Sequence, residues 1–164
     1  MANQSPIQIK PDFEERYPNS SAKATECAMN LVLTSDLIVK RISILLQPFG
    51  LSPASALVLS ILADSESPLS PNKIADRLII SRATVTGLVD SLEKRGYAQR
   101  FPHQTDRRML LVQPTEKGRQ VADQFRPIVH QHQKVWLGVL GKDEQQQLID
   151  SLQRLQATLS DSET

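Results

Sequence analysis

The sequence predicts a mainly α-helical fold with one small β-hairpin. Apolar residues recur at i, i+3, i+4 and i+7 along most of the chain, which is the spacing of amphipathic helices. Two Ser-Pro pairs, at 52–53 and 70–71, each place an N-cap residue before a proline at the first helical position. Only residues 97–112 contain short runs that are typical of paired strands. At 164 residues the chain is expected to form one domain of ordinary size, with two lobes that share one core as the alternative.

The beginning of the chain divides into an arm and a long helix. Residues 1–20 contain three prolines and mixed charge, which predicts an irregular N-terminal arm. From about Ser21 an apolar stripe of helical spacing continues until Pro48 and Gly50 end it. A single long helix is therefore expected over residues 21–50.

Residues 52–114 are predicted to form a winged helix-turn-helix. Three short helices follow one another, and a tight turn before Ser81 separates the last two, which is the helix-turn-helix pattern. Two strands with a basic connection come next and supply the wing. The expected parts of this hairpin are a strand at 97–101, a polar and basic tip at 102–108, and a returning strand at 109–112.

Two further helices are predicted after the hairpin. Pro114-Thr115-Glu116 caps a long helix that continues to about Leu140, with a bend expected at Pro127. After Gly141, an otherwise polar helix carries one narrow stripe of leucines at 148, 152, 155 and 159. Such a stripe is typical of packing between helices. We therefore assign residues 21–50 and 115–160 to a helical dimerisation region, with packing inside one chain as the alternative.

Basic charge is concentrated in the middle of the chain. The whole sequence has 19 Lys and Arg against 18 Asp and Glu, a net charge of +1. Residues 73–119 hold ten of the basic and five of the acidic residues, a balance of +5, and the remainder holds nine against 13, a balance of −4. This asymmetry predicts a segment that faces a polyanion. A solvated basic face is the alternative.

The composition excludes several other classes. No run approaches the roughly 18 apolar residues of a membrane span, and the N-terminus has no apolar signal core, so a cytoplasmic location is expected. The single cysteine, Cys27, excludes an intrachain disulfide framework. Aromatic residues make up 4% of the chain, which disfavours RNA or single strands as the ligand.

The helix that begins at Ser81 has an unusual start. Its inward stripe is apolar, whereas its first outward positions are small, hydroxylated or basic, and these residue types are poor helix formers apart from arginine. Small side chains let a helix approach the floor of the major groove, where threonine can contact a thymine methyl group and arginine can bond guanine. The candidate DNA-binding residues are Ser81, Arg82, Thr84 and Thr86. The alternative is that these residues are merely tolerated on a solvated face.

The tip of the hairpin carries a second candidate set. Arg107 and Arg108 lie at the end of the two expected strands, where they can reach a minor groove or phosphate groups. Asp106 does not attract DNA, and its expected role is to orient an arginine through a charge-assisted hydrogen bond. A solvated turn with a weak local ion pair is the alternative.

The order of helices and two motifs resemble the MarR family of bacterial transcription regulators. The motifs are S-x-x-T-V-T-x-L-V-x-x-L-E-x-x-G over residues 81–96 and the D-x-R of Asp106 and Arg108, and the resemblance covers about residues 22–160. It implies an obligate homodimer of winged-helix lobes that usually represses genes. Many members release DNA when a small anionic phenolic compound, an oxidant or a metal binds.

The resemblance also implies roles by position. Ser81, Arg82, Thr84 and Thr86 would lie in the major groove, and Arg108 would reach the minor groove, braced by Asp106. Arg107 fills a variable position and is expected to contact phosphate. Where the family commonly has Leu-Thr after the second strand, this chain has Pro114-Thr115, which should leave the Thr115 cap intact.

Other functions lack a matching pattern. Cys27 has only Lys23 as a basic neighbour within a turn, so a buried structural cysteine is expected rather than a reactive thiol. His130 and His132 are two residues apart on a helix and point to different faces, so no metal site is expected. No catalytic constellation or phosphate loop is present, so neither an enzyme nor a cofactor is predicted.

The sequence therefore predicts a homodimeric, sequence-specific regulator that binds double-stranded DNA and acts as a repressor. Release by a small-molecule effector is a further property that the resemblance implies. The alternative is a winged-helix module that docks another protein and does not bind specific DNA, because fold does not fix function. A protein-docking wing would not need the basic surplus of residues 73–119.

Overall fold

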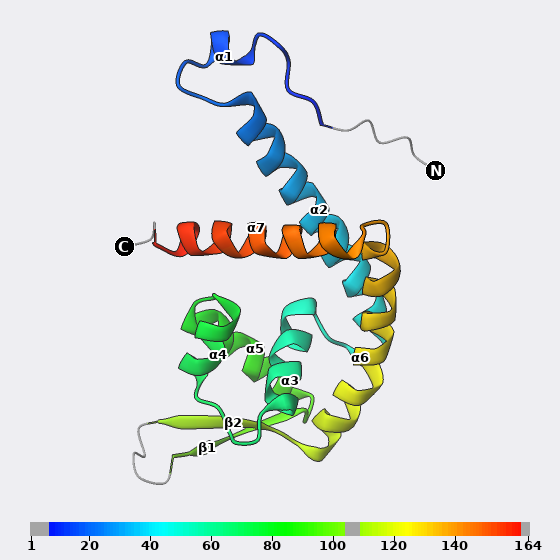
Figure 1. The fold of residues 1–164 in the computed structure, drawn as a ribbon. Coiled ribbons are helices and arrows are strands. Elements are labelled where there is room, and N and C mark those ends of the chain that lie inside the picture. Colours follow the sequence, from blue (N-terminus) through cyan, green and yellow to red (C-terminus); the bar gives the residue numbers. More distant parts are fainter. Residues whose placement is uncertain (1–6, 104–108, 162–164) are drawn as a thin grey trace. The chain divides into compact units, whose positions relative to one another are not determined.

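The computed structural model describes residues 7–103 and 109–161. The chain divides into two compact units, Met1–Ile44 and Leu45–Thr164. The first contains the N-terminal arm and most of helix α2, and the second contains the remaining helices and the hairpin (Figure 1). Within the described ranges no single helix is long and apolar enough to cross a membrane. Only the bent pair formed by residues 22–49 and 53–64 of this described part reaches that length and apolar composition.

The first unit is built around the start of a long helix. α1 (Phe13–Arg16) is a single turn within the arm, and α2 spans Ala22–Leu46. The Ser21 hydroxyl accepts from the Ala24 N–H (3.2 Å), and the Glu14 carboxylate accepts from the Ala22 N–H (2.9 Å). These two acceptors satisfy donors that a helix N-terminus leaves without partners. The arm is thereby attached to the first turn of α2.

Both predicted Ser-Pro caps are present in the second unit. A 3-10 helix, η1 (Gln47–Phe49), follows α2 and ends at Gly50 with φ 65°. Ser52 caps α3 (Pro53–Asp64) by accepting from the Ser55 N–H (3.1 Å). Ser70 caps α4 (Pro71–Leu78) by accepting from the Lys73 N–H (3.3 Å).

The wing is an antiparallel pair, β1 (Ala98–Pro102) and β2 (Leu110–Pro114), which follows α5 (Arg82–Lys94). Its register joins Ala98 to Pro114 and Pro102 to Leu110, so both strands begin one residue later than predicted. Tyr97 does not open the strand because its N–H closes the last turn of α5 on the Leu92 carbonyl (2.9 Å). Pro114 is accommodated at the strand end, where its missing N–H disturbs no ladder bond.

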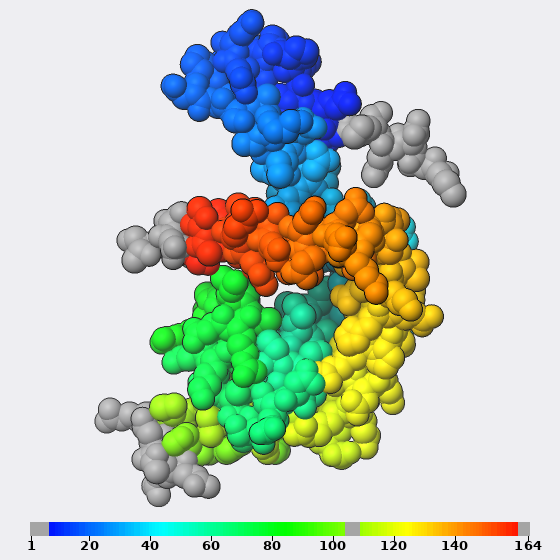
Figure 2. Space-filling model, viewed as in Figure 1, coloured from blue at the N-terminus to red at the C-terminus, as the bar shows by residue number. Residues whose placement is uncertain are grey.

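The core of the second unit lies between α3, α4, α5 and the hairpin. A short third strand segment contributes, since Leu69 and Val112 exchange both backbone hydrogen bonds (2.9 and 2.8 Å). α6 (Glu116–Leu137) covers this core with Ala122 and Phe125. Figure 2 shows α4, in green, and α3, in blue-green, as one continuous body beside the hairpin. The fully buried large side chains are Leu46, Val58, Leu59, Leu62, Ile74, Val85, Val89, Leu92 and Val112.

Two helices leave apolar faces exposed. α7 (Lys142–Asp161) exposes Leu148, Ile149, Leu155 and Leu159, which include three of the four predicted leucines. α2 exposes Met29, Leu31, Val32, Leu33, Leu37, Val39 and Ile44. Cys27 is also exposed, so the expectation of a buried cysteine is wrong for this chain. The reason is that it lies on the part of α2 that precedes the packed core, where most neighbouring side chains are exposed as well.

Candidate DNA-binding surface

The turn before α5 and its first residues form a locally determined cap. Ser81 is the N-cap, and its hydroxyl accepts from the Thr84 N–H (3.1 Å) and bonds the Thr84 hydroxyl (2.8 Å). Two residues before Ser81, Ile79 ends α4 with a backbone conformation in the left-handed region, φ 53°. A β-branched residue rarely adopts this conformation, and the Ile79 side chain is 61% exposed. The helix-turn-helix is therefore closed by backbone geometry and not by packing of Ile79.

The buried face of α5 supports its weakly helical start. Val85, Val89 and Leu92 are fully buried, and Leu88 is half-buried, so the predicted inward stripe is present. Burial of such side chains stabilises by roughly 1.5–3 kcal/mol each, which exceeds the few tenths to about 1 kcal/mol that each poor helix former costs. Stability of α5 therefore does not require strong helix formers at its outward positions.

The predicted major-groove residues are all exposed on the first turns of α5. Arg82, Thr84 and Thr86 are classed as exposed, and nothing lies within 4 Å of the position that a Cβ on Gly87 would take. The Thr86 hydroxyl donates to the carbonyl of Arg82 (3.0 Å). Across the described residues, the Arg82 guanidinium has neither a hydrogen bond nor an ion pair. The structure gathers Ser81, Arg82, Thr84 and Thr86 on one helix start.

The tip of the wing holds the other predicted residues. Asp106, Arg107 and Arg108 lie outside the described residues, so their roles stay predictions. At the loop end of the hairpin, the His103 N–H donates to the Met109 carbonyl (2.8 Å). Both strands are therefore paired up to the residues that flank the tip.

One set of contacts beside the proposed DNA-binding residues was missed by the sequence analysis. Arg100, the third residue of β1, donates to Asp90 (2.5 Å), Glu93 (2.5 Å) and the carbonyl of Thr86 (3.0 Å). Its backbone N–H also donates to Glu93 (2.7 Å). The sequence does contain a pattern that could indicate this ion pair, namely two carboxylates three residues apart on α5 and an arginine in the next strand. The same pattern is common on solvated faces, so it does not identify a site.

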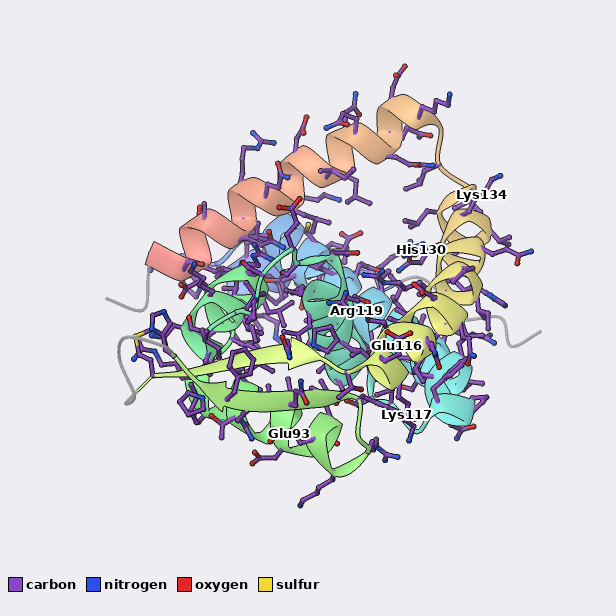
Figure 3. The ribbon with its side chains drawn as sticks, turned by 90° about the horizontal axis from the view of Figure 1, so that it is seen from below. Glu93, Glu116, Lys117, Arg119, His130 and Lys134 are labelled. Carbon is purple, nitrogen blue, oxygen red and sulfur yellow. The ribbon has the colours of Figure 1, made fainter. Side chains whose placement is uncertain are left out.

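Part of the basic surplus serves the fold. The Lys117 ammonium donates to the Arg95 carbonyl (3.0 Å) and lies 5.0 Å from the centre of the Tyr97 ring. Arg119 donates to the Ala63 carbonyl (3.1 Å). Figure 3 shows Lys117 and Glu116 at the start of α6, beside the end of the hairpin. With Arg100, these residues reduce the charge that is free to meet a polyanion.

The start of α6 is joined to the base of the wing. Thr115 caps α6 by accepting from the Gly118 N–H (3.0 Å), as predicted, and its hydroxyl donates to the Gly96 carbonyl (2.6 Å). The Thr115 N–H donates to the Tyr97 carbonyl (3.0 Å). Further along α6, Arg126 donates to the Ser60 carbonyl (2.7 Å) and pairs with Asp64 (2.6 Å) of α3. These bonds fix α6 on the winged-helix core.

Comparison with known proteins gives one consistent result. The model of the MarR family matches residues 49–109. The transcriptional repressor YetL of Bacillus subtilis is 32% identical over 120 residues, which cover 71% of this chain and 70% of YetL. The structure of CouR from Rhodococcus jostii bound to p-coumaroyl-CoA is 25% identical, with a TM-score of 0.73 over 83% of this chain and 95% of CouR. A complex of S. aureus MepR with DNA is 20% identical, with a TM-score of 0.76 over 80% of this chain and 96% of MepR.

Proposed function

This chain belongs to the MarR family of DNA-binding transcriptional regulators, which are not enzymes, and we propose that it acts in the cytoplasm as a homodimeric repressor of a pseudo-palindromic operator. Each protomer would place the start of α5 in a major groove. Two such helices would then read half-sites about one helical turn of DNA, roughly 10 base pairs, apart.

The observation that carries the proposal is that Arg82 is exposed and has no partner among the described residues. It is the first residue of α5, it is exposed, and no described residue pairs with it, whereas Arg100, Lys117 and Arg119 are held by the fold. An arginine at a helix start beside short hydroxylated side chains suits bidentate bonding to guanine. The helix N-terminus adds an attraction for the neighbouring phosphates.

Support for the homodimer comes from the apolar faces of α2 and α7. Leucine, isoleucine, valine and methionine side chains are exposed along α2, and leucine and isoleucine side chains along α7. Clustered apolar side chains on the surface of a helix are typical of an interaction site. A second copy of the chain would cover these faces with the same residues, as two-fold symmetry requires. The roles of Asp106, Arg107 and Arg108 at the wing tip remain part of the proposal.

An effector belongs to the proposal in a limited form. CouR, a structural relative, carries p-coumaroyl-CoA, which is a phenolic and anionic compound. We propose a small anionic phenolic compound as the first class to test for release of this chain from DNA. The expected result is a lower affinity for the operator in the presence of the compound.

The test is fluorescence anisotropy of the purified protein on the duplex upstream of its own gene, beside a scrambled duplex, at about 150 mM salt. The native duplex should bind at least about a thousandfold more tightly than the scrambled one. Arg82→Ala should lower that preference, with a loss of roughly 1–3 kcal/mol at one base pair. Lys94→Ala is the matched control, because Lys94 is an exposed basic residue at the opposite end of the same helix.

A different outcome would favour the rival function. Equal and weak binding to every duplex, including those of the neighbouring genes, would contradict the repressor and point to a module that docks another protein. Equal losses from Arg82→Ala on specific and scrambled DNA would contradict the major-groove role while leaving DNA binding intact.

A further inference from the structure

Arg100, a residue of β1, bonds one side of α5 that continues from the proposed groove-reading end. Arg82, Thr86, Asp90 and Glu93 are spaced by four, four and three residues, which places them along one side of a helix. The first two are at the proposed reading end. The last two are acidic, and their charges would repel phosphate groups if they were left unpaired. Arg100 bonds both carboxylates and also the backbone carbonyl of Thr86.

The contacts of Arg100 are partly shielded from water. Its side chain is 18% exposed, against 31% for Glu93 and 50% for Asp90. One terminal nitrogen of the guanidinium serves both carboxylates, and the other serves the Thr86 carbonyl. A lysine has one ammonium nitrogen and cannot reproduce this planar arrangement. The three bonds therefore depend on arginine and span two turns of α5.

We propose that Arg100 is a positioning residue, which sets the reading end of α5 relative to the wing strand and so supports sequence preference. This inference rests on the proposed DNA-binding function. Arg100 makes its contacts from β1, and β1 continues toward the wing tip. Movement of α5 against β1 would therefore change the position of the residues proposed for the major groove relative to the wing strands.

Two simpler roles predict different results. If Arg100 only masked the charges of Asp90 and Glu93, its loss would weaken all duplexes equally. If it only stabilised the fold, its loss would lower stability without changing the preference of the folded protein. A positioning role instead changes the ratio of the affinities for specific and scrambled DNA.

The experiment uses a duplex recovered from a random pool by the full-length wild-type protein, and a scrambled duplex of the same composition. Arg100→Lys should bind the scrambled duplex within about twofold of wild type, because the charge is kept, and its specific-to-scrambled ratio should fall by at least about tenfold. Arg126→Lys is the matched control. Arg126 is 19% exposed and also joins a carboxylate to a backbone carbonyl, but it lies between α3 and α6. Its ratio should stay unchanged.

A second variant keeps Arg100 and removes its partners. Asp90→Asn with Glu93→Gln should bind scrambled DNA more tightly, since two negative charges are lost, while the ratio still falls. Folding of each variant is checked by its helical circular dichroism. An unchanged ratio in this variant or in Arg100→Lys overturns the proposal, as does a matching fall in the Arg126→Lys control. If the wild-type protein recovers no duplex at all, the proposed function itself fails, and this result is distinguishable because it precedes every variant.

Discussion

Gly118→Ala and Gly87→Ala should change the stability of this protein in opposite directions. Both glycines lie inside helices, α6 and α5 respectively, where alanine is favoured over glycine by about 0.5–1 kcal/mol. A Cβ on Gly87 would meet nothing within 4 Å. A Cβ on Gly118 would lie 1.9 Å from the carbonyl oxygen of Tyr97. Helix propensity therefore decides the first substitution, and steric overlap decides the second.

The magnitude at Gly118 follows from what must move. The start of α6 has to withdraw by more than about 1 Å from Tyr97 to reach an ordinary contact distance. The Thr115 N–H then loses the Tyr97 carbonyl, and the Thr115 hydroxyl loses the Gly96 carbonyl. Two hydrogen bonds at about 1 kcal/mol each, with packing strain of about 1–3 kcal/mol, outweigh the propensity gain. The net loss is expected to be about 2–4 kcal/mol.

Urea unfolding followed by helical circular dichroism measures both effects at one fixed protein concentration. Gly87→Ala should raise the free energy of unfolding by about 0.5–1 kcal/mol and should leave the m-value unchanged. The reasoning is refuted if Gly118→Ala stays within about 0.5 kcal/mol of wild type, because the close approach to Tyr97 would then carry no stability.

Three other substitutions test separate features. Ile79→Gly should raise the free energy of unfolding by about 1 kcal/mol, because glycine adopts the left-handed backbone conformation of this position without the strain of an exposed β-branched side chain. A lower urea midpoint would contradict this. Leu155→Glu should convert the proposed homodimer to monomer in light scattering, whereas its exposed neighbour control Gln156→Glu should not. Arg107→Ala should weaken all duplexes alike and lower the salt slope by about one unit, and a loss that depended on sequence would argue against a phosphate contact.

Local rules were sufficient to predict the helix starts. Ser52, Ser70, Ser81 and Thr115 each accept from the backbone N–H of the third residue of their helix. A cap depends on residues within one turn, so a sequence pattern contains nearly all of the information. The arrangement of three helices and a hairpin followed from these starts together with apolar spacing.

Features set by distant residues were missed or misplaced. β1 begins one residue later than predicted because the Tyr97 N–H belongs to the end of α5, which a propensity pattern does not show. The bonds of Arg100 depend on how β1 returns beside α5. Cys27 was expected to be buried because its sequence neighbours gave no support for a reactive thiol, and its exposure reflects the part of α2 on which it lies. The residues proposed to contact DNA were identified as a cluster, and their contacts remain predictions.

The hydrogen bond between Thr86 and Arg82 limits which base the proposed site can prefer. The only hydroxyl proton of Thr86 is already directed at a carbonyl of its own helix. Thr86 can therefore accept a hydrogen bond or offer its methyl group, but it cannot donate to a base without breaking that bond. Guanine presents only acceptors in the major groove, whereas adenine and cytosine present amino donors and thymine presents a methyl group. This hydrogen bond within the helix thus disfavours guanine as the base that faces Thr86 in the proposed site.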